Sequence, residues 1–201
     1  MPLLYHNNNS ISNVTSFAQV PSGSLTLLST ATASSSSSIS FTSGIDSTYD
    51  VYCFEYINCH PSTVADFQFN MSTDNGSNYN VTKTTTFFSA MHSENDSVAS
   101  LAYSLGNDLA QSTAYQTLCY VVNTNSDDCV SGKLFLYNPS STTYVKHFMT
   151  ISQGVVVDGI VLSLNPYVAG YGNTTSAVNA IRFQMSSGNI DAGTIKMYGI
   201  K

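Results

Sequence analysis

Residues 181–201 read IRFQMSSGNIDAGTIKMYGIK, and apolar side chains alternate with polar ones along two stretches of this segment. Alternate residues of a β-strand point to the same side of the sheet, so this pattern predicts two strands. The Gly, Asn and Asp residues between them are typical of a surface turn. We therefore expect the closing hairpin of a β-sandwich, in which Gly199 marks a bulge or a close packing contact. Five side chains form its expected core face: Ile181, Phe183, Met185, Ile195 and Met197.

The strongest strand signal elsewhere is STYDVYCFEYIN at residues 47–58. It places Tyr52, Phe54 and Tyr56 on one face, and the opposite face is also largely apolar, which predicts an inner strand. Asp158-Gly159 between apolar arms predicts a tight hairpin. Helical spacing in segment 98–109 allows a short helix, but Gly106 and Asn107 interrupt it, so we expect a long loop with at most one helical turn between two strands. Further strands are expected near residues 24–30, 39–41, 65–72, 85–90, 115–123, 132–139 and 143–152.

Short strands without any β-α-β alternation indicate an all-β protein, and we expect an antiparallel, jelly-roll-like β-sandwich. The sandwich should be a single domain of residues 23–201, preceded by an extended N-terminal arm of residues 1–22. The arm is expected to dock on a partner, because it carries apolar residues between polar ones. Its anchors would be Leu3, Leu4, Ile11 and Phe17.

The charge and composition of the chain limit the classes of molecule that it is expected to bind. Charged residues make up 9% of the 201 residues, against roughly 25% in an average domain. The net charge is −6 with six Lys and Arg, so we expect neither nucleic acid nor an anionic membrane as a partner. The N-terminal sequence lacks the pattern of a signal peptide, which predicts synthesis and assembly in a cytoplasm.

Cysteines and histidines give no catalytic or metal-binding pattern. The four cysteines lack a Cys-x-x-Cys pair, and we expect buried or half-buried thiols, with a Cys119–Cys129 disulfide as the alternative. The histidines are far apart in the sequence and stand in no metal-binding frame. No catalytic residue, metal ligand or cofactor is therefore assigned, and we expect a non-enzymatic protein.

Two weaker candidates for chemistry remain. In an extended segment Glu94 and Asp96 would lie on the same face of the chain. Their carboxylates could then bind a hard cation or act in a polysaccharide-degrading enzyme. The simpler interpretation is a solvated loop. Tyrosines in loop-like contexts are candidate surface contacts to a sugar or a protein. These are Tyr79, Tyr144, Tyr167 and Tyr171.

Four segments together resemble a family of small structural proteins of marine tailed bacteriophages. They are GIDSTYDVYCFEYINCHPST (44–63), LAQSTAYQTL (109–118), LFLYNPSSTTYVKHF (134–148) and SSGNIDAGTIKMYGIK (186–201). The resemblance covers most of residues 40–201. It implies a virion protein with a β-sandwich body in symmetric groups, with a trimer favoured, and it carries over no catalytic residue.

The resulting hypothesis is a capsid decoration or cement protein. It would bind the major capsid protein or other virion proteins through its N-terminal arm and one edge of the sandwich. Its location would be the virion, assembled in the host cytoplasm. The alternative is a tail-associated fibre or adhesin that binds a host-surface glycan through the loop tyrosines.

Overall fold

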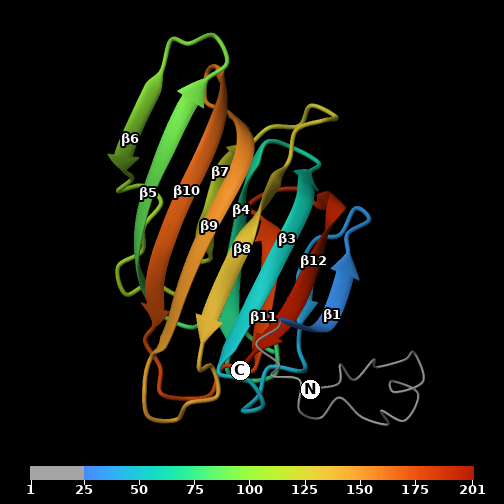
Figure 1. The fold of residues 1–201 in the computed structure, drawn as a ribbon, viewed down its shortest axis with the longest axis vertical. Coiled ribbons are helices and arrows are strands. Elements are labelled where there is room, and N and C mark those ends of the chain that lie inside the picture. Colours follow the sequence, from blue (N-terminus) through green and yellow to red (C-terminus); the bar gives the residue numbers. More distant parts are fainter. Residues whose placement is uncertain (1–24) are drawn as a thin grey trace, which may run out of the picture.

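The computed structural model describes residues 25–201, in which every regular element is a β-strand. The twelve strands are antiparallel to their neighbours and form one continuous sheet that folds over on itself (Figure 1). They are β1 (Thr26–Thr32), β2 (Ile39–Phe41), β3 (Val51–Pro61), β4 (Ala65–Ser72), β5 (Lys83–Ser93), β6 (Ala99–Tyr103), β7 (Gln116–Val122), β8 (Val130–Tyr137), β9 (Lys146–Val157), β10 (Val161–Gly172), β11 (Ala180–Met185) and β12 (Ile190–Ile200).

Eight of these strands pair as a jelly roll. One layer contains β1, β12, β3 and β8 in that order, and the other contains β2, β11, β4 and β7. The first of the eight therefore lies beside the last, and the second beside the next to last, which is the nested Greek-key pairing of this fold. The expected all-β, jelly-roll-like sandwich is confirmed.

Two hairpins are inserted into the jelly roll. β5 and β6 come between β4 and β7, and β9 and β10 come between β8 and β11. They extend the first layer beyond β8 in the order β9, β10, β5, β6, so that β6 and β1 lie at opposite edges of the front layer (Figure 1). The extension also reaches the second layer, because Val156 of β9 pairs with Val122 of β7.

Aromatic side chains fill the space between the two layers. Tyr52, Phe54 and Tyr56 of β3 are all fully buried on one face, as their alternation predicts. The Phe183 ring of β11 lies 5.7 Å from the Phe54 ring of the opposite layer and 6.0 Å from Phe67 of β4, measured between centroids. Buried aromatic residues contribute large apolar areas, so these contacts hold the layers together.

The closing segment differs in one respect from the expectation. Its five expected core residues are buried, but β11 and β12 do not form a hairpin with each other. β11 pairs with β4 and β2, whereas β12 pairs with β3 and β1 in the other layer. The turn at residues 186–189 therefore crosses between layers. Alternation identifies the buried face of a strand and leaves its hydrogen-bonded neighbour open.

Two local expectations have opposite outcomes. The Asp158-Gly159 hairpin is confirmed, since it joins β9 to β10 with Gly159 at a φ of 75°. Its turn has three residues, 158–160, where two were expected. The helical turn allowed in segment 98–109 is not formed, because this segment begins with strand β6 and continues as irregular chain. Pairing with β5 provides hydrogen bonds on one side of β6, and this tertiary contact overrides the local helical spacing. The arm of residues 1–22, with Leu3, Leu4, Ile11 and Phe17, lies outside the described residues.

Candidate functional site

Tyr79 is not a surface contact, which corrects one expectation. Only 9% of this residue is exposed, and the guanidinium of Arg182 lies 4.0 Å from the centre of its ring. Arg182 belongs to β11, which lies beside β4. The cation covers the ring and favours its burial through a cation–π contact.

The other three tyrosines reach the surface. Tyr144 is well exposed in the segment before β9. Tyr167 and Tyr171 lie on β10, at positions that share one face of the sheet. The Tyr167 ring stacks on Phe88 with centroids 5.1 Å apart, and the Tyr171 ring meets His147 edge-on at 6.2 Å. The structure thus brings two predicted tyrosines to the outer face of the inserted hairpins.

The strand register explains how this outer face is built. Tyr167 lies directly opposite Phe88 of β5 on one side and Ile151 of β9 on the other, and Phe88 lies opposite Tyr103 of β6. Directly paired residues of neighbouring strands point to the same side. We call the resulting surface the aromatic face, and it consists of six exposed side chains: Phe88, Leu101, Tyr103, Met149, Ile151 and Tyr167.

Two shallow hollows lie on the outer side of this sheet. The larger, of about 490 Å³, lies among Tyr137, His147, Met149 and Tyr171, with the small residues Ala169 and Gly170 beneath it. The smaller, of about 280 Å³, includes Tyr137, Met149 and Tyr167. No Asp, Glu, Lys or Arg lines either hollow. An uncharged aromatic surface of this kind suits contacts with a protein or a sugar ring.

A third hollow is polar and lies between the C-terminal end of β3, the segment before β8 and the start of β12. It has a volume of about 560 Å³, and its lining includes His60, Asp127, Asp128 and Asp191. His60 Nδ1 is 3.9 Å from Asp191 Oδ2, and Asn123 Nδ2 donates a 2.7 Å hydrogen bond to Asp128 Oδ2. Within residues 25–201 no three His, Cys, Asp or Glu side chains are grouped so as to hold a metal ion.

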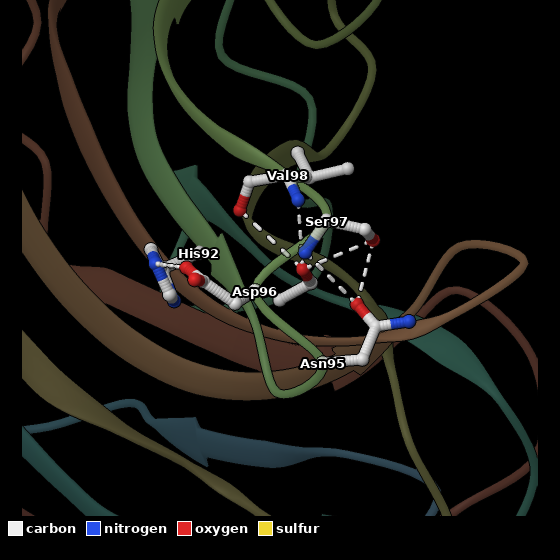
Figure 2. A network of polar contacts seen from close by, with 6 residues as sticks. His92, Asn95, Asp96, Ser97 and Val98 are labelled. Carbon is white, nitrogen blue, oxygen red and sulfur yellow. Dashed lines mark hydrogen bonds and ion pairs between the residues drawn. The ribbon is translucent and has the colours of Figure 1, made fainter.

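Glu94 and Asp96 do not share a face of an extended strand. They lie in the turn between β5 and β6, where Asp96 has a positive φ of 59° and its Oδ1 is 3.2 Å from His92 Nε2 (Figure 2). Because a turn replaces the strand here, the alternation on which the proposed cation site depended is absent. The local geometry therefore does not support the cation or enzyme assignment of this pair.

The cysteines confirm the expectation of buried or half-buried thiols. All four are free, and Cys53, Cys59 and Cys119 are buried, so the Cys119–Cys129 disulfide is not formed. Burial raises the pKa of the Cys53 thiol to about 11 and that of Cys59 to about 12, and it also raises the pKa of Cys119. A protonated thiol is a poor nucleophile, so these groups act as core side chains.

Two lysines have an unexpected place in the structure. Lys83 of β5 and Lys146 of β9 are both fully buried, and each pairs with Gly172 of β10 between them. Lys83 Nζ donates to Asn70 Oδ1 at 2.6 Å and to the Val81 carbonyl at 2.8 Å. Burial lowers the pKa of Lys83 to about 7. Sequence reasoning counted these lysines only toward the net charge of −6.

Comparisons with known proteins add no relative. No protein-family model matches the chain, and neither does any curated protein or solved structure. The fold thus defines the class by itself, an all-β protein with jelly-roll pairing and an extended front layer. Within the described residues no helix has the length and hydropathy needed to cross a membrane.

Proposed function

We propose that the chain is a non-enzymatic structural protein of a bacteriophage particle, of the capsid decoration or cement type. The observation that carries this proposal is the exposed, apolar aromatic face on a jelly-roll body. Charged groups lie at its border, where Asp108 accepts a hydrogen bond from Tyr103 and Lys133 lies opposite Ile151. Jelly rolls recur in viral capsid domains, and exposed apolar patches with aromatic residues are typical of protein contacts. The sequence resemblance to structural proteins of marine tailed phages supports the same assignment.

Attachment is assigned to the N-terminal arm, with Leu3, Leu4, Ile11 and Phe17 as anchors, and to one edge of the sandwich. The partner is the major capsid protein or another virion protein, and the copies form symmetric groups, trimers by preference. Assembly takes place in the host cytoplasm and the protein ends in the virion. Because charged residues make up only 9% of the chain, such contacts depend little on Coulomb attraction and should tolerate high salt.

Co-sedimentation of purified protein with phage particles that lack it tests the attachment model. Full-length protein is expected to bind, and a chain without residues 1–20 is expected to lose binding. A full-length variant with Ser at positions 3, 4, 11 and 17 separates the apolar anchors from the length of the arm, and it should also lose binding. Unchanged binding of both variants would show that the arm model is wrong.

A second candidate function is glycan binding by a tail-associated fibre or adhesin. The larger hollow favours it, because Tyr171 and His147 stand beside the hydroxyl groups of Thr84 and Thr86, above Ala169 and Gly170. Small residues under an aromatic rim leave room for a sugar ring to stack. Lectin domains also use jelly rolls.

This candidate predicts that the purified protein adsorbs to host cells and that Tyr171→Ala abolishes adsorption. Leu105→Ala is the control, because Leu105 is exposed and lines neither hollow. Lack of adsorption by the unmodified protein at saturating concentration would eliminate the adhesin assignment.

A further inference from the structure

Strand β6 forms an open edge of the front layer. It pairs only with β5, in regular register from Ala99 to Tyr103, and all five of its side chains are exposed. Its sequence, ASLAY, has no charge and no proline. Natural edge strands are usually protected by such residues, because unpaired backbone groups are a template for another strand.

The hydrogen bonds of the ladder show which backbone groups are free. Ser93 N–H donates to the Val98 carbonyl and Ser104 N–H donates to the Phe87 carbonyl, both at 2.9 Å. Residues that alternate along an antiparallel strand direct their N–H and C=O groups to the same side. The backbone groups of Ala99, Leu101 and Tyr103 therefore point away from β5, toward the open edge.

The other edges of the fold are less suited to pairing. β1 has a bulge between Leu27 and Ser29, and β2 has only three residues. A bulge or a very short strand hinders the addition of another strand. β7 is paired on its outer side only at Val122, but most of its residues are buried. β6 is therefore the regular and exposed edge among the strands of residues 25–201.

The turn before β6 holds this edge in place. Asn95 Oδ1 accepts hydrogen bonds from Ser97 N–H at 3.1 Å and from Ser97 Oγ at 2.6 Å, and Ser93 Oγ accepts one from Val98 N–H at 2.9 Å (Figure 2). The His92–Asp96 contact closes the same turn. Such local bonds fix the start of β6, so a partner strand meets an ordered template.

We infer that β6 pairs with β6 of a second copy of this chain, antiparallel about a two-fold axis at Leu101. In this register Leu101 lies opposite Leu101 of the second copy, and Ala99 lies opposite Tyr103. These are the three residues with free backbone groups, so each pair exchanges two hydrogen bonds and the contact gains about six. The same patch serves both copies, as a two-fold interface requires.

A second copy fits this edge better than an unrelated strand for two reasons. The three free residues are symmetric about Leu101, so the edge is complementary to itself. None of the five strand residues is charged, so the paired positions place no like charges opposite each other although the chain has a net charge of −6. The carboxylate that reaches the strand, Asp108, accepts a 2.7 Å hydrogen bond from the Tyr103 hydroxyl. Leu101 and Tyr103 then join the two aromatic faces into one continuous surface.

The inference stands apart from the proposed function, because it depends only on the described edge. It is compatible with symmetric groups, since a two-fold contact can connect one group to the next. The N-terminal arm of the same chain is the competing occupant of the β6 edge, and removal of residues 1–22 distinguishes it from a second copy.

Disulfide trapping tests the register. Cα atoms of a hydrogen-bonded antiparallel pair are about 5.5 Å apart, which suits a disulfide. Leu101→Cys should therefore form a covalent dimer under mild oxidation. Leu27→Cys is the matched control, because Leu27 is an exposed leucine on the opposite edge strand. The unmodified chain, whose thiols are mostly buried, gives the background.

Analytical sedimentation of Leu101→Lys tests the stability of the proposed dimer. The substitution places two like charges beside each other at the two-fold axis. We expect its dimer dissociation constant to rise by roughly tenfold or more, while Leu27→Lys and a chain without residues 1–22 dimerise as the full chain does. Equal thiol crosslinking at positions 27 and 101, or unchanged dimerisation of Leu101→Lys, would overturn the inference. Dimerisation that appears only after removal of residues 1–22 would also overturn it, because the arm would then be the occupant.

Discussion

Lys83 Nζ donates a 2.6 Å hydrogen bond to Asn70 Oδ1, and both side chains are fully buried in the sandwich. Asn70 also donates from Nδ2 to the carbonyls of Tyr79, at 2.7 Å, and Thr113, at 3.0 Å. One amide thus connects β4, the segment before β5 and the segment before β7. No carboxylate forms an ion pair with Lys83 within residues 25–201, so the amine depends on neutral oxygens.

Asn70→Leu should destabilise the protein by about 3 kcal/mol, because it removes a partner of the buried amine and leaves two carbonyls unsatisfied. Lys83→Met should cost less, about 1 kcal/mol, because it removes the amine together with its need for partners. Urea denaturation of both variants measures the two values. A larger loss for Lys83→Met than for Asn70→Leu would contradict this account of the pair.

The low pKa of Lys83 predicts a rise in stability with pH. Its folded pKa is about 7, below the ordinary value of 10.5, so between these values the unfolded chain binds the extra proton. The free energy of unfolding therefore rises with pH in this window, by at most about 1.4 kcal/mol per unit. Above pH 9.0, the ordinary pKa of a thiol, the buried cysteines oppose this rise in stability. Their raised pKa values keep the folded chain protonated where the unfolded chain loses protons.

The comparison with Lys83→Met isolates this effect, since the thiols are common to both proteins. From pH 7 to pH 9 the free energy of unfolding of the unmodified protein should increase relative to that of Lys83→Met. Denaturation curves at several pH values give this difference. A difference independent of pH would show that Lys83 titrates normally in the folded protein.

Gly199→Ala should disrupt the contact of β12 with Tyr49. A Cβ atom at residue 199 would lie 2.4 Å from Cγ of the Tyr49 ring. The overlap forces the ring or the strand to move, and we expect a loss of about 2 kcal/mol or more. Gly106→Ala is the matched control, because no atom lies within 4 Å of the added methyl group. Thermal melting compares them, and equal transitions would contradict the packing described.

Removal of the last eight residues should abolish cooperative folding. β12 lies between β1 and β3, and Ile195 and Met197 are buried in the core. The truncated chain would lose both side chains and leave the edges of two strands open. Solubility and a melting curve test this. A soluble truncated protein with an unchanged transition would be incompatible with the role assigned to β12.

The sequence predicts the strands well because burial imposes a period of two on them. Tyr52, Phe54 and Tyr56 are an example, since all three face the core. Pairing partners are harder to predict, and β11 pairs with β4, more than one hundred residues earlier in the chain. Register between distant strands depends on the whole topology, which local alternation does not contain.

The same reason explains what sequence reasoning missed in the candidate site. β5 has adjacent phenylalanines, and Phe87 is fully buried whereas Phe88 is 42% exposed. Only the register with β10 places Phe88 beside Tyr167. Tyr79 shows the reverse error, because the arginine that covers its ring comes from β11, far along the chain.

Quantitative mass spectrometry of phage particles purified from lysates that contain this chain tests the central proposal most directly. A decoration protein is predicted to be present in a copy number comparable with that of the major capsid protein. A copy number comparable with that of a tail component would favour the adhesin alternative instead. Absence of the chain from particles that carry their full set of structural proteins would contradict the proposal that it is a virion protein.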